Sequence, residues 1–370
     1  MNYLPLYELA CKCLMLDDQP QGAVEIAEIL LSGKVSHENF IFFCDGHLEL
    51  PAVYKKLKDH KLLEGFPADL AAHLNEIYEL NQKRNKGIIR QAEDIAALLH
   101  QNNITAVFLK GTAHLLDGLY EDPGERLMGD IDMLVTEENY LKTAEILMDS
   151  GYENHFRFFS DVKMLKHYPR LFKKDVPADV EIHRLPVNTE YAKVFSSELL
   201  FSLKKRIPKK TNCYVPDDIH KLVHNFIHGQ LSNSGYRFRH ISLRDFYDLY
   251  LLSKRTKPAK ALPYIEEKNK AAGYFLFCAK MSGLGDGFFS TENKKAERHA
   301  KRVIWALERP RFSHCAKTIM KLNDLVFKRY LSRVLKATWQ HSSRQYIRRR
   351  LSDPHWYKLH VKGLRKYFRG

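Results

Sequence analysis

Two short stretches constrain the fold and the chemistry of this chain more than any other part of its sequence. The first, Val107–Thr112, is an apolar run that ends in a Lys-Gly step and leads into a helical pattern. The second, Gly129–Val135, has the pattern of a strand and carries Asp130 and Asp132. Because side chains alternate along a strand, these two carboxylates point to the same side, roughly 6.5–7 Å apart.

This combination of residues suits the binding of phosphate and metal. Two carboxylates on one side of a strand provide hard oxygen ligands, which Mg²⁺ prefers. Gly111 lets the backbone come close to an anion, the amides after it through Thr112 open a helix, and Lys110 adds a positive charge. Either motif alone is more often a solvated surface feature. Together they predict a two-part site.

The stretch LKGTAHLLDGLYEDPGERLMGDIDMLV resembles the nucleotidyltransferase proteins of the polymerase-β-like superfamily. The resemblance is to the bacterial branch in which a Lys-Gly step stands where classical members have Gly-Gly or Gly-Ser. It covers roughly residues 70–255. It implies that residues 110–112 lie beside the triphosphate of an NTP, that Asp130 and Asp132 hold Mg²⁺, and that Arg126 neutralises phosphate charge. The stretch departs from the classical pattern in a longer gap before Asp130, where we expect 117–127 to form a helix end and a loop.

A third carboxylate is needed to accept the proton of an attacking hydroxyl. The run Ala178–Leu185 alternates polar and apolar residues, which predicts a half-buried strand with Asp179, Glu181 and His183 on one face. Taken alone, this face reads as ordinary exposed charge. The resemblance implies that Glu181 is the third carboxylate, with Asp179 as the alternative. His183 would bind phosphate, orient Glu181 or cap the strand.

Polar residues on two predicted helices are further candidates. In the long helical pattern of residues 67–100, Asn85 interrupts the apolar stripe and is expected to be exposed or near the nucleotide. In the helix after Pro216, His220, His224 and His228 follow one another at four-residue spacing on one face, but the outer pair is about 12 Å apart along the axis, so all three cannot bind one ion. The resemblance implies instead that His228 and Asp245 belong to a helical part that closes over the nucleotide.

The order of these patterns predicts an α+β fold: a small mixed β-sheet nucleotidyltransferase core flanked by N- and C-terminal helical regions. We expect residues 1–66 to form a helical region and 67–207 the core with its leading long helix. Residues 208–300 would form the helical domain that closes over the nucleotide. Residues 152–177 are expected to add two strands or a hairpin, with Arg170 on a solvated face.

Positive charge is concentrated at the end of the chain. The formal net charge is +15, yet residues 301–370 hold 19 Lys and Arg and 3 acidic residues, which leaves −1 for residues 1–300. The last segment is therefore predicted to be a basic amphipathic extension. It would pack as a solvated helical extension on the body or a second subunit, or contact an anionic membrane at 310–370, or contact nucleic acid.

The leading hypothesis is an Mg²⁺-dependent nucleotidyltransferase, with Mn²⁺ as the alternative metal. It would move an NMP from an NTP, first of all ATP, to an acceptor hydroxyl, a small molecule being favoured, and release pyrophosphate. The alternatives are a toxin-type enzyme that extends RNA or tRNA 3′ ends, and a non-catalytic membrane-docked scaffold with a degenerate nucleotide site. Scattered cysteines and no secretory pattern at residues 1–15 predict a cytoplasmic protein, with peripheral contact at the inner membrane surface as the variant.

Overall fold

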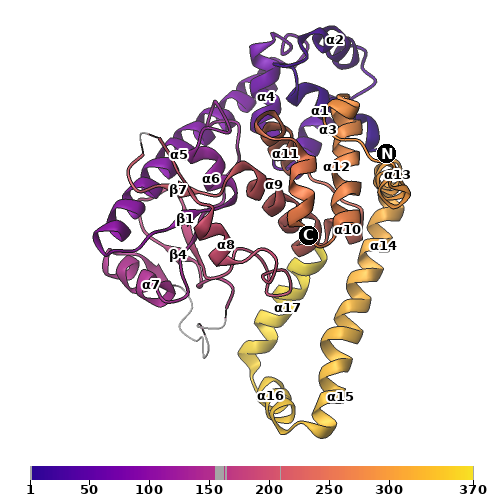
Figure 1. Ribbon diagram of the computed structural model, residues 1–370. Helices are drawn as coiled ribbons and strands as arrows, with labels where there is room; N and C mark the ends of the chain where they lie inside the picture. The colour runs from indigo at the N-terminus through magenta and orange to yellow at the C-terminus, as the bar shows by residue number, and fades with distance from the viewer. Residues whose placement is uncertain (1, 155–161, 163–164, 209, 370) are drawn as a thin grey trace. The chain divides into compact units, whose positions relative to one another are not determined.

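The computed structural model describes residues 2–154, 162, 165–208 and 210–369. The chain divides into two compact units. One is formed by Leu4–Trp305, and the other by Met1–Tyr3 with Ala306–Gly370. The larger unit combines many helices with a seven-stranded mixed sheet, which confirms the α+β prediction (Figure 1).

A helical region precedes the sheet in the sequence. Its helices are α1 (Leu4–Leu14), α2 (Ala23–Leu31), α3 (His37–Gly46), α4 (Leu50–Asp59) and α5 (Ala68–Gln101). Local residues set the starts of α3 and α4. Ser36 caps α3 by accepting a hydrogen bond from the backbone of Asn39 at 3.3 Å, and Pro51 lies in the first turn of α4.

Helix α5 carries two polar residues that sequence analysis placed at its surface or near the nucleotide. Asn81 and Asn85 are instead buried, at 5% and 0% exposure. The expectation of exposed positions was wrong because a long loop covers this face of the helix and supplies backbone acceptors. On another face of α5, a Cβ atom at Gly87 would lie 3.1 Å from Cγ of Pro177, so the helix packs closely against that proline.

The sheet brings together strands that are distant in the sequence. The strands are β1 (Val107–Phe108), β2 (Asp130–Leu134), β3 (Glu153–Asn154), β4 (Leu171–Phe172), β5 (Asp179–His183), β6 (Lys205–Arg206) and β7 (Tyr214–Val215). Their order is β3-β4-β5-β2-β1-β7-β6. Strands β2 and β5 are parallel neighbours, and their register sets Asp130 beside Asp179 and Asp132 beside Glu181. The polar faces of the two predicted strands are therefore one surface.

Two short helices and a hairpin complete the core. Helix α6 (Lys110–Leu116) follows β1 directly, and α7 (Tyr140–Asp149) follows β2. Helix α7 begins after Asn139, whose side-chain amide donates to Oγ1 of Thr136 at 3.0 Å and closes a turn before the helix. Strands β3 and β4 pair antiparallel, and residues 155–161 and 163–164 between them lie outside the described part.

After the sheet, the chain continues as a series of helices. They are α8 (Ser197–Ser202), α9 (Asp218–Phe226), a π-helical segment (Ile227–Ser232), α10 (Gly235–Phe238), α11 (Leu243–Arg255), α12 (Lys268–Ser282) and α13 (Lys294–Glu308). Asp217 caps α9 and Ser242 caps α11, each by accepting a backbone hydrogen bond at 3.0 Å. At Gly229 a Cβ atom would lie 2.7 Å from Oδ2 of Asp245, so the π-helical segment packs closely on the start of α11.

The second unit is helical. After residue 306 it contains α14 (Pro310–Asn323), a π-helical segment (Asp324–Leu331), α15 (Ser332–Trp339), α16 (His341–Leu351) and α17 (Pro354–Arg369). Throughout the described part of the chain, we find no helix with the length and apolar character that a membrane crossing requires.

Candidate active site

The turn between β1 and α6 positions Lys110. Strand β1 ends in the buried residues Phe108 and Leu109, and the backbone N–H of Leu109 donates to the carbonyl of Asp132 at 2.9 Å. Lys110 then adopts a positive φ of 51°, a conformation that costs a non-glycine residue roughly 1–2 kcal/mol. The strained turn directs the ammonium group to Oδ1 of Asp132, 2.6 Å away.

The next two residues have different roles. Gly111 lines the cavity of the site, and a Cβ atom there would lie 2.4 Å from Sδ of Met128, so a larger residue would displace the methionine side chain. Thr112 is 1% exposed. Its hydroxyl accepts a hydrogen bond from the backbone N–H of Asp132 at 3.2 Å and lies 3.4 Å from the carbonyl of Asp130. Thr112 therefore ties α6 to β2.

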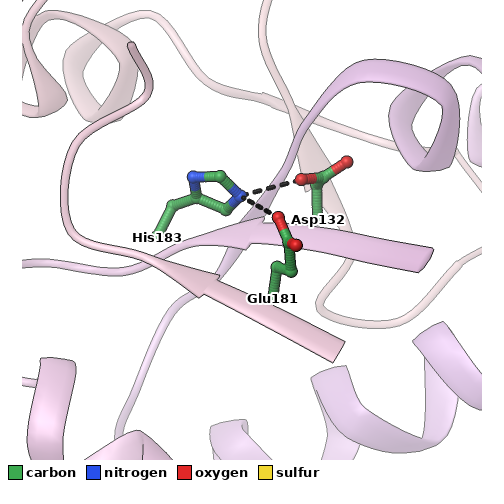
Figure 2. A group of neighbouring side chains, drawn as sticks. All are labelled: Asp132, Glu181 and His183. Atoms are coloured by element: carbon green, nitrogen blue, oxygen red, sulfur yellow. Dashed lines mark hydrogen bonds and ion pairs between the residues drawn. The ribbon is translucent and has the colours of Figure 1, made fainter. Parts of the chain in front are cut away.

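Three side chains from the two central strands converge at one point (Figure 2). One ligand atom each from Asp132, Glu181 and His183 lie within 4.8 Å of one another. Nε2 of His183 is 2.8 Å from Oδ1 of Asp132 and 3.5 Å from Oε2 of Glu181. The imidazole is fully buried and therefore fixes both carboxylates in place.

Arg170 occupies the space between the remaining carboxylate oxygens. Its Nη2 atom lies 2.6 Å from Oδ2 of Asp130 and 2.6 Å from Oε1 of Glu181. The side chain of Arg170 is 46% exposed, in line with the solvated face expected for it, but antiparallel pairing of β4 with β5 also sets it beside Glu181. A guanidinium that bridges two carboxylates shows that this position accepts a cation. Asp179 lies beside Asp130 in the sheet but is not among the described residues that line the cavity.

The carboxylates differ in proton affinity. Burial, with the charges of Asp132 and Glu181, raises the pKa of Asp130 from 3.8 to about 6. Burial alone would also raise the pKa of Asp132, but the charge of Lys110 and the hydrogen bond from His183 hold it far below its usual range. Burial likewise opposes ionisation of Glu181, yet hydrogen bonds from His183 and Arg170 lower its pKa to about 2. Of these three carboxyl groups, Asp130 therefore has the pKa nearest to neutral pH.

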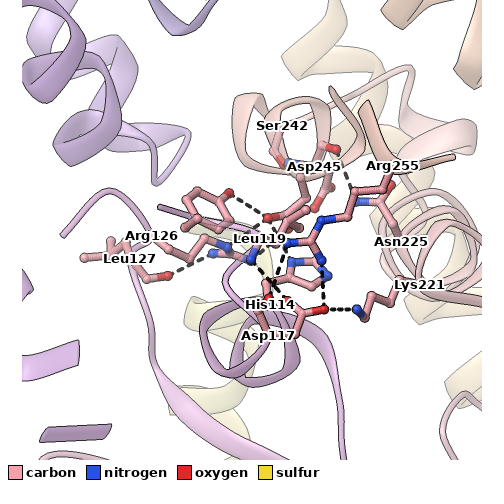
Figure 3. Close-up of polar contacts among 12 residues, drawn as sticks. His114, Asp117, Leu119, Arg126, Leu127, Lys221, Asn225, Ser242, Asp245 and Arg255 are labelled. Carbon is pink, nitrogen blue, oxygen red and sulfur yellow. Dashed lines mark hydrogen bonds and ion pairs between the residues drawn. The ribbon is translucent and has the colours of Figure 1, made fainter. Parts of the chain in front are cut away.

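A buried ion pair forms part of the opposite wall (Figure 3). Arg126 is 6% exposed, and its Nε and Nη2 atoms donate to the two oxygens of Asp248 at 3.0 and 2.9 Å. The same carboxylate contacts Nδ1 of His114 at 3.2 Å and accepts from the hydroxyl of Tyr120 at 2.7 Å. Arg126 therefore faces the cavity with much of its hydrogen-bonding capacity already used.

The loop that carries Arg126 is anchored by helix α5. Asn85 donates to the carbonyls of Pro123 and Arg126 at 2.5 and 2.6 Å, and Asn81 donates to that of Gly124 at 2.8 Å. Each amide thus satisfies buried backbone acceptors that the loop could not pair by itself. The insertion between α6 and β2 is consequently a fixed wall of the site.

Helices α9 and α11 supply the far side of the cavity. His224 and His228 both line it, and burial, followed by the charge of Lys110, lowers their pKa values, that of His228 to about 3. Both imidazoles are therefore neutral at neutral pH. Arg244 and Asp245, in the first turn of α11, also line the cavity. Among the described residues, Nε of Arg244 is buried without a hydrogen-bond acceptor.

The cavity joins these groups. It has a volume of about 430 Å³, and its charged lining residues are Lys110, Arg126, Asp130, Asp132, Arg170, Glu181, Lys221, Arg244, Asp245 and Asp248. The cavity lining includes most of the site residues predicted from the sequence; Thr112 and His183 are buried outside it, and the alternative candidates Asn85 and Asp179 do not line it. Sequence analysis did not single out Lys221 or His224 for this site, and it gave Arg170 and Arg244 little weight.

The family model described as "Uncharacterised nucleotidyltransferase" matches residues 35–289 of the chain. The chain belongs to this family. The match extends beyond the predicted resemblance at both ends and includes most of the cavity-forming helices. Membership makes the chain a transferase of the nucleotidyl class. Searches of curated proteins and of solved structures gave no match.

The residues present fit a divalent metal ion. Asp132 and Glu181 offer carboxylate oxygens and His183 an imidazole nitrogen, and the guanidinium of Arg170 already stands in for a cation beside them. Carboxylates suit Mg²⁺ and Mn²⁺, whereas imidazole extends the range toward softer ions. The family and this cluster together support use of a divalent metal.

Proposed function

We propose that this chain is an Mg²⁺-dependent nucleotidyltransferase, with Mn²⁺ as the alternative, that moves an NMP from an NTP to an acceptor hydroxyl. ATP is the first candidate donor and a small molecule the favoured acceptor. The observation that carries the proposal is the single cavity in which the Lys110-Gly111 turn meets the carboxylates of two adjacent parallel strands.

In the proposed reaction the acceptor oxygen forms a bond to the α-phosphorus, and the bond from that phosphorus to the oxygen bridging to the β-phosphate breaks. Pyrophosphate leaves. A divalent ion held by Asp130, Asp132 and Glu181 would neutralise charge on the phosphates and on the attacking oxygen. Glu181 would take the proton of the acceptor hydroxyl. Hydrogen bonds from His183 and Arg170 hold the pKa of Glu181 low, so release of Arg170 would raise its affinity for that proton.

His183 would act by orientation, since it is buried behind Asp132 and Glu181 and bonded to Asp132. Thr112 would likewise position β2 beneath the phosphates. These two residues are proposed to hold the reactive groups at a fixed separation, on which the rate of a displacement depends strongly.

The phosphates of the NTP would bind between two cationic sides of the cavity. Lys110 and the Gly111 backbone form one side, and Arg244 forms the other, where its buried Nε atom has no acceptor among the described residues. Arg126 would add charge, with its remaining N–H groups available for hydrogen bonds. His228 would provide a neutral contact.

The proposed domain organisation follows from this assignment. Residues 67–207 would form the catalytic core, and residues 208–300 would close over the nucleotide through His228 and Asp245. Residues 1–66 would support the core from outside the cavity. Residues 301–370 would form a separate extension.

A transfer assay tests the proposal. The purified chain is incubated with each α-labelled NTP, Mg²⁺ and cell extract divided into small-molecule, RNA and protein fractions. Asp130→Asn should abolish transfer, whereas Asp179→Asn, on the neighbouring strand but outside the described cavity lining, should retain it. Label in the RNA fraction would instead favour a tRNA-end or RNA-end transferase. Neither transfer nor NTP binding would favour a scaffold with a degenerate site.

A further inference from the structure

The surface of the C-terminal unit has a chemistry of its own. From the π-helical segment into α15, large apolar side chains recur three or four residues apart and remain between 42% and 65% exposed. We call this set the apolar stripe: Val326, Phe327, Leu331, Val334, Leu335 and Trp339. Scattered apolar residues are normal on a protein surface, but a continuous row of them marks an interaction site.

Positive charge accompanies the apolar stripe. Between Asp324 and Asp353 the sequence has no acidic residue and eight Lys or Arg. Three of them, Arg348, Arg349 and Arg350, are consecutive in α16. The segment thus combines an exposed apolar row with an uninterrupted basic field, which is the composition of helices that lie in the interface of an anionic bilayer.

This surface is independent of the proposed active site. The family match ends at residue 289, before the segment begins, and residues 1–300 carry a formal net charge of −1. The excess positive charge is therefore not needed for phosphate binding in the cavity. This charge belongs to a segment that lies outside the family match.

We propose that residues 310–369 dock the protein reversibly on a bilayer that contains anionic lipids. The apolar stripe enters the boundary between headgroups and acyl chains, and the arginines of α16 face the lipid phosphates. The described residues include no membrane-spanning helix, so docking is peripheral.

The chemistry favours lipid over two other occupants. Nucleic acid could use the phosphate contacts and stack bases on Phe327 and Trp339, but it would leave the four aliphatic members of the apolar stripe in water. A second copy of residues 310–369 would bring 16 basic and 2 acidic residues against the same set, so like charges would oppose the association. An anionic bilayer matches the charge and the apolar row together.

Vesicle binding by the full chain tests the proposal. Vesicles of equal parts phosphatidylglycerol and phosphatidylcholine should carry the protein in flotation, and vesicles of phosphatidylcholine alone should not. Replacing Arg348, Arg349 and Arg350 together by Gln should weaken binding roughly a hundredfold, since each charge near the surface contributes about fivefold. The double variant Leu331→Gln with Leu335→Gln should also weaken it. Phe42→Gln, which changes a 79% exposed side chain of α3, is the matched control and should bind as wild type.

A spectroscopic readout reports the position of the apolar stripe directly. The chain has three tryptophans, Trp305, Trp339 and Trp356. With Trp305→Phe and Trp356→Phe, the emission of the remaining Trp339, 65% exposed in the free protein, should shift to the blue on phosphatidylglycerol vesicles. An unshifted emission would overturn the insertion of the stripe.

Other outcomes also decide the matter. Binding to a single-stranded RNA oligonucleotide that the leucine variant leaves intact, without binding to either vesicle, would overturn the proposal in favour of nucleic acid. Absence of binding to both would overturn it in favour of a solvated extension. Loss of vesicle binding in the arginine and leucine variants, with unfolding transitions equal to wild type, would support it.

Discussion

Asp130 and Asp132 lie two residues apart on β2, and replacing each with Asn should change the free energy of unfolding in opposite directions. Asp130→Asn should stabilise the metal-free protein while it abolishes transfer. The reason is that Asp130 is ionised at neutral pH in an environment that disfavours its charge, with Asp132 and Glu181 as like-charged neighbours.

The magnitude follows from the pKa of Asp130, which is about 6 in the folded protein against a reference of 3.8. That difference corresponds to roughly 3 kcal/mol, at 1.36 kcal/mol for each unit of pKa. Between these two values the folded state binds more protons than the unfolded state, so this group lowers the free energy of unfolding as the pH rises. Asp130→Asn lacks this titrating group. Its free energy of unfolding should therefore exceed that of wild type by near zero at about pH 4 and by between about 1 and 3 kcal/mol at about pH 7.

Urea unfolding of wild type and variant in a chelator, across this pH range, measures the difference. Taking the difference cancels the titrating groups that do not interact with Asp130. A variant that is no more stable than wild type at neutral pH, or an advantage that does not depend on pH, would refute the reasoning. Saturating Mg²⁺ should narrow the gap, because only wild type offers the ion all three carboxylates.

Asp132→Asn provides the contrast. The pKa of Asp132 is held far below its usual range by Lys110 and His183 despite burial, so its charge stabilises the fold. Removing it leaves the ammonium of Lys110 without its carboxylate, at a cost of about 3 kcal/mol. The same urea titration reports this loss, and a stable Asp132→Asn protein would contradict the assignment.

Three further changes test the framework of the site. Lys110→Gly and Lys110→Ala both remove the ammonium, but only glycine adopts the positive φ without strain. The Gly variant should therefore be about 1 kcal/mol more stable than the Ala variant in urea unfolding. Equal stabilities would show that the turn at Lys110 is not strained. Asn85→Ala should lower the free energy of unfolding by about 2 kcal/mol in thermal denaturation, because buried loop carbonyls lose a donor; a neutral effect would mean that the loop does not depend on α5. Gly111→Ala brings a Cβ atom to 2.4 Å from Sδ of Met128 and should weaken NTP binding at least about tenfold in titration calorimetry. The control Gly129→Ala, which has open space around its Cβ, should bind NTP as wild type does. Similar affinities of the two variants would argue that no phosphate approaches the Gly111 backbone closely.

Local patterns explain what the sequence could predict. The alternation around Asp132 and Glu181 places each carboxylate on the polar face of its own strand, and strand periodicity is a property of a few consecutive residues. The turn at Lys110 is equally local, since it depends on one glycine after an apolar strand. These elements, and the α+β class, therefore follow from the residues themselves.

The remaining features depend on contacts between distant residues. That Asp132 stands beside Glu181 follows from the sheet order, in which β5 lies next to β2 although 44 residues, including α7, β3 and β4, separate the two strands in the sequence. Arg170 reaches both carboxylates only because β4 pairs with β5. The burial of Asn85 depends on a loop almost forty residues away. Periodicity carries no information on such pairings, so a polar residue in a helix or hairpin reads as exposed.

The contact of Arg170 with Asp130 and Glu181 gives the resting site an internal counter-ion. A metal ion that arrives alone must compete with this tethered cation, whereas one that arrives with a triphosphate brings a new anionic partner for the released guanidinium. Metal and nucleotide should therefore strengthen each other's binding by the same factor, as thermodynamic linkage requires. Such a site should bind free divalent ions only weakly and should be loaded most readily by the ion–nucleotide complex.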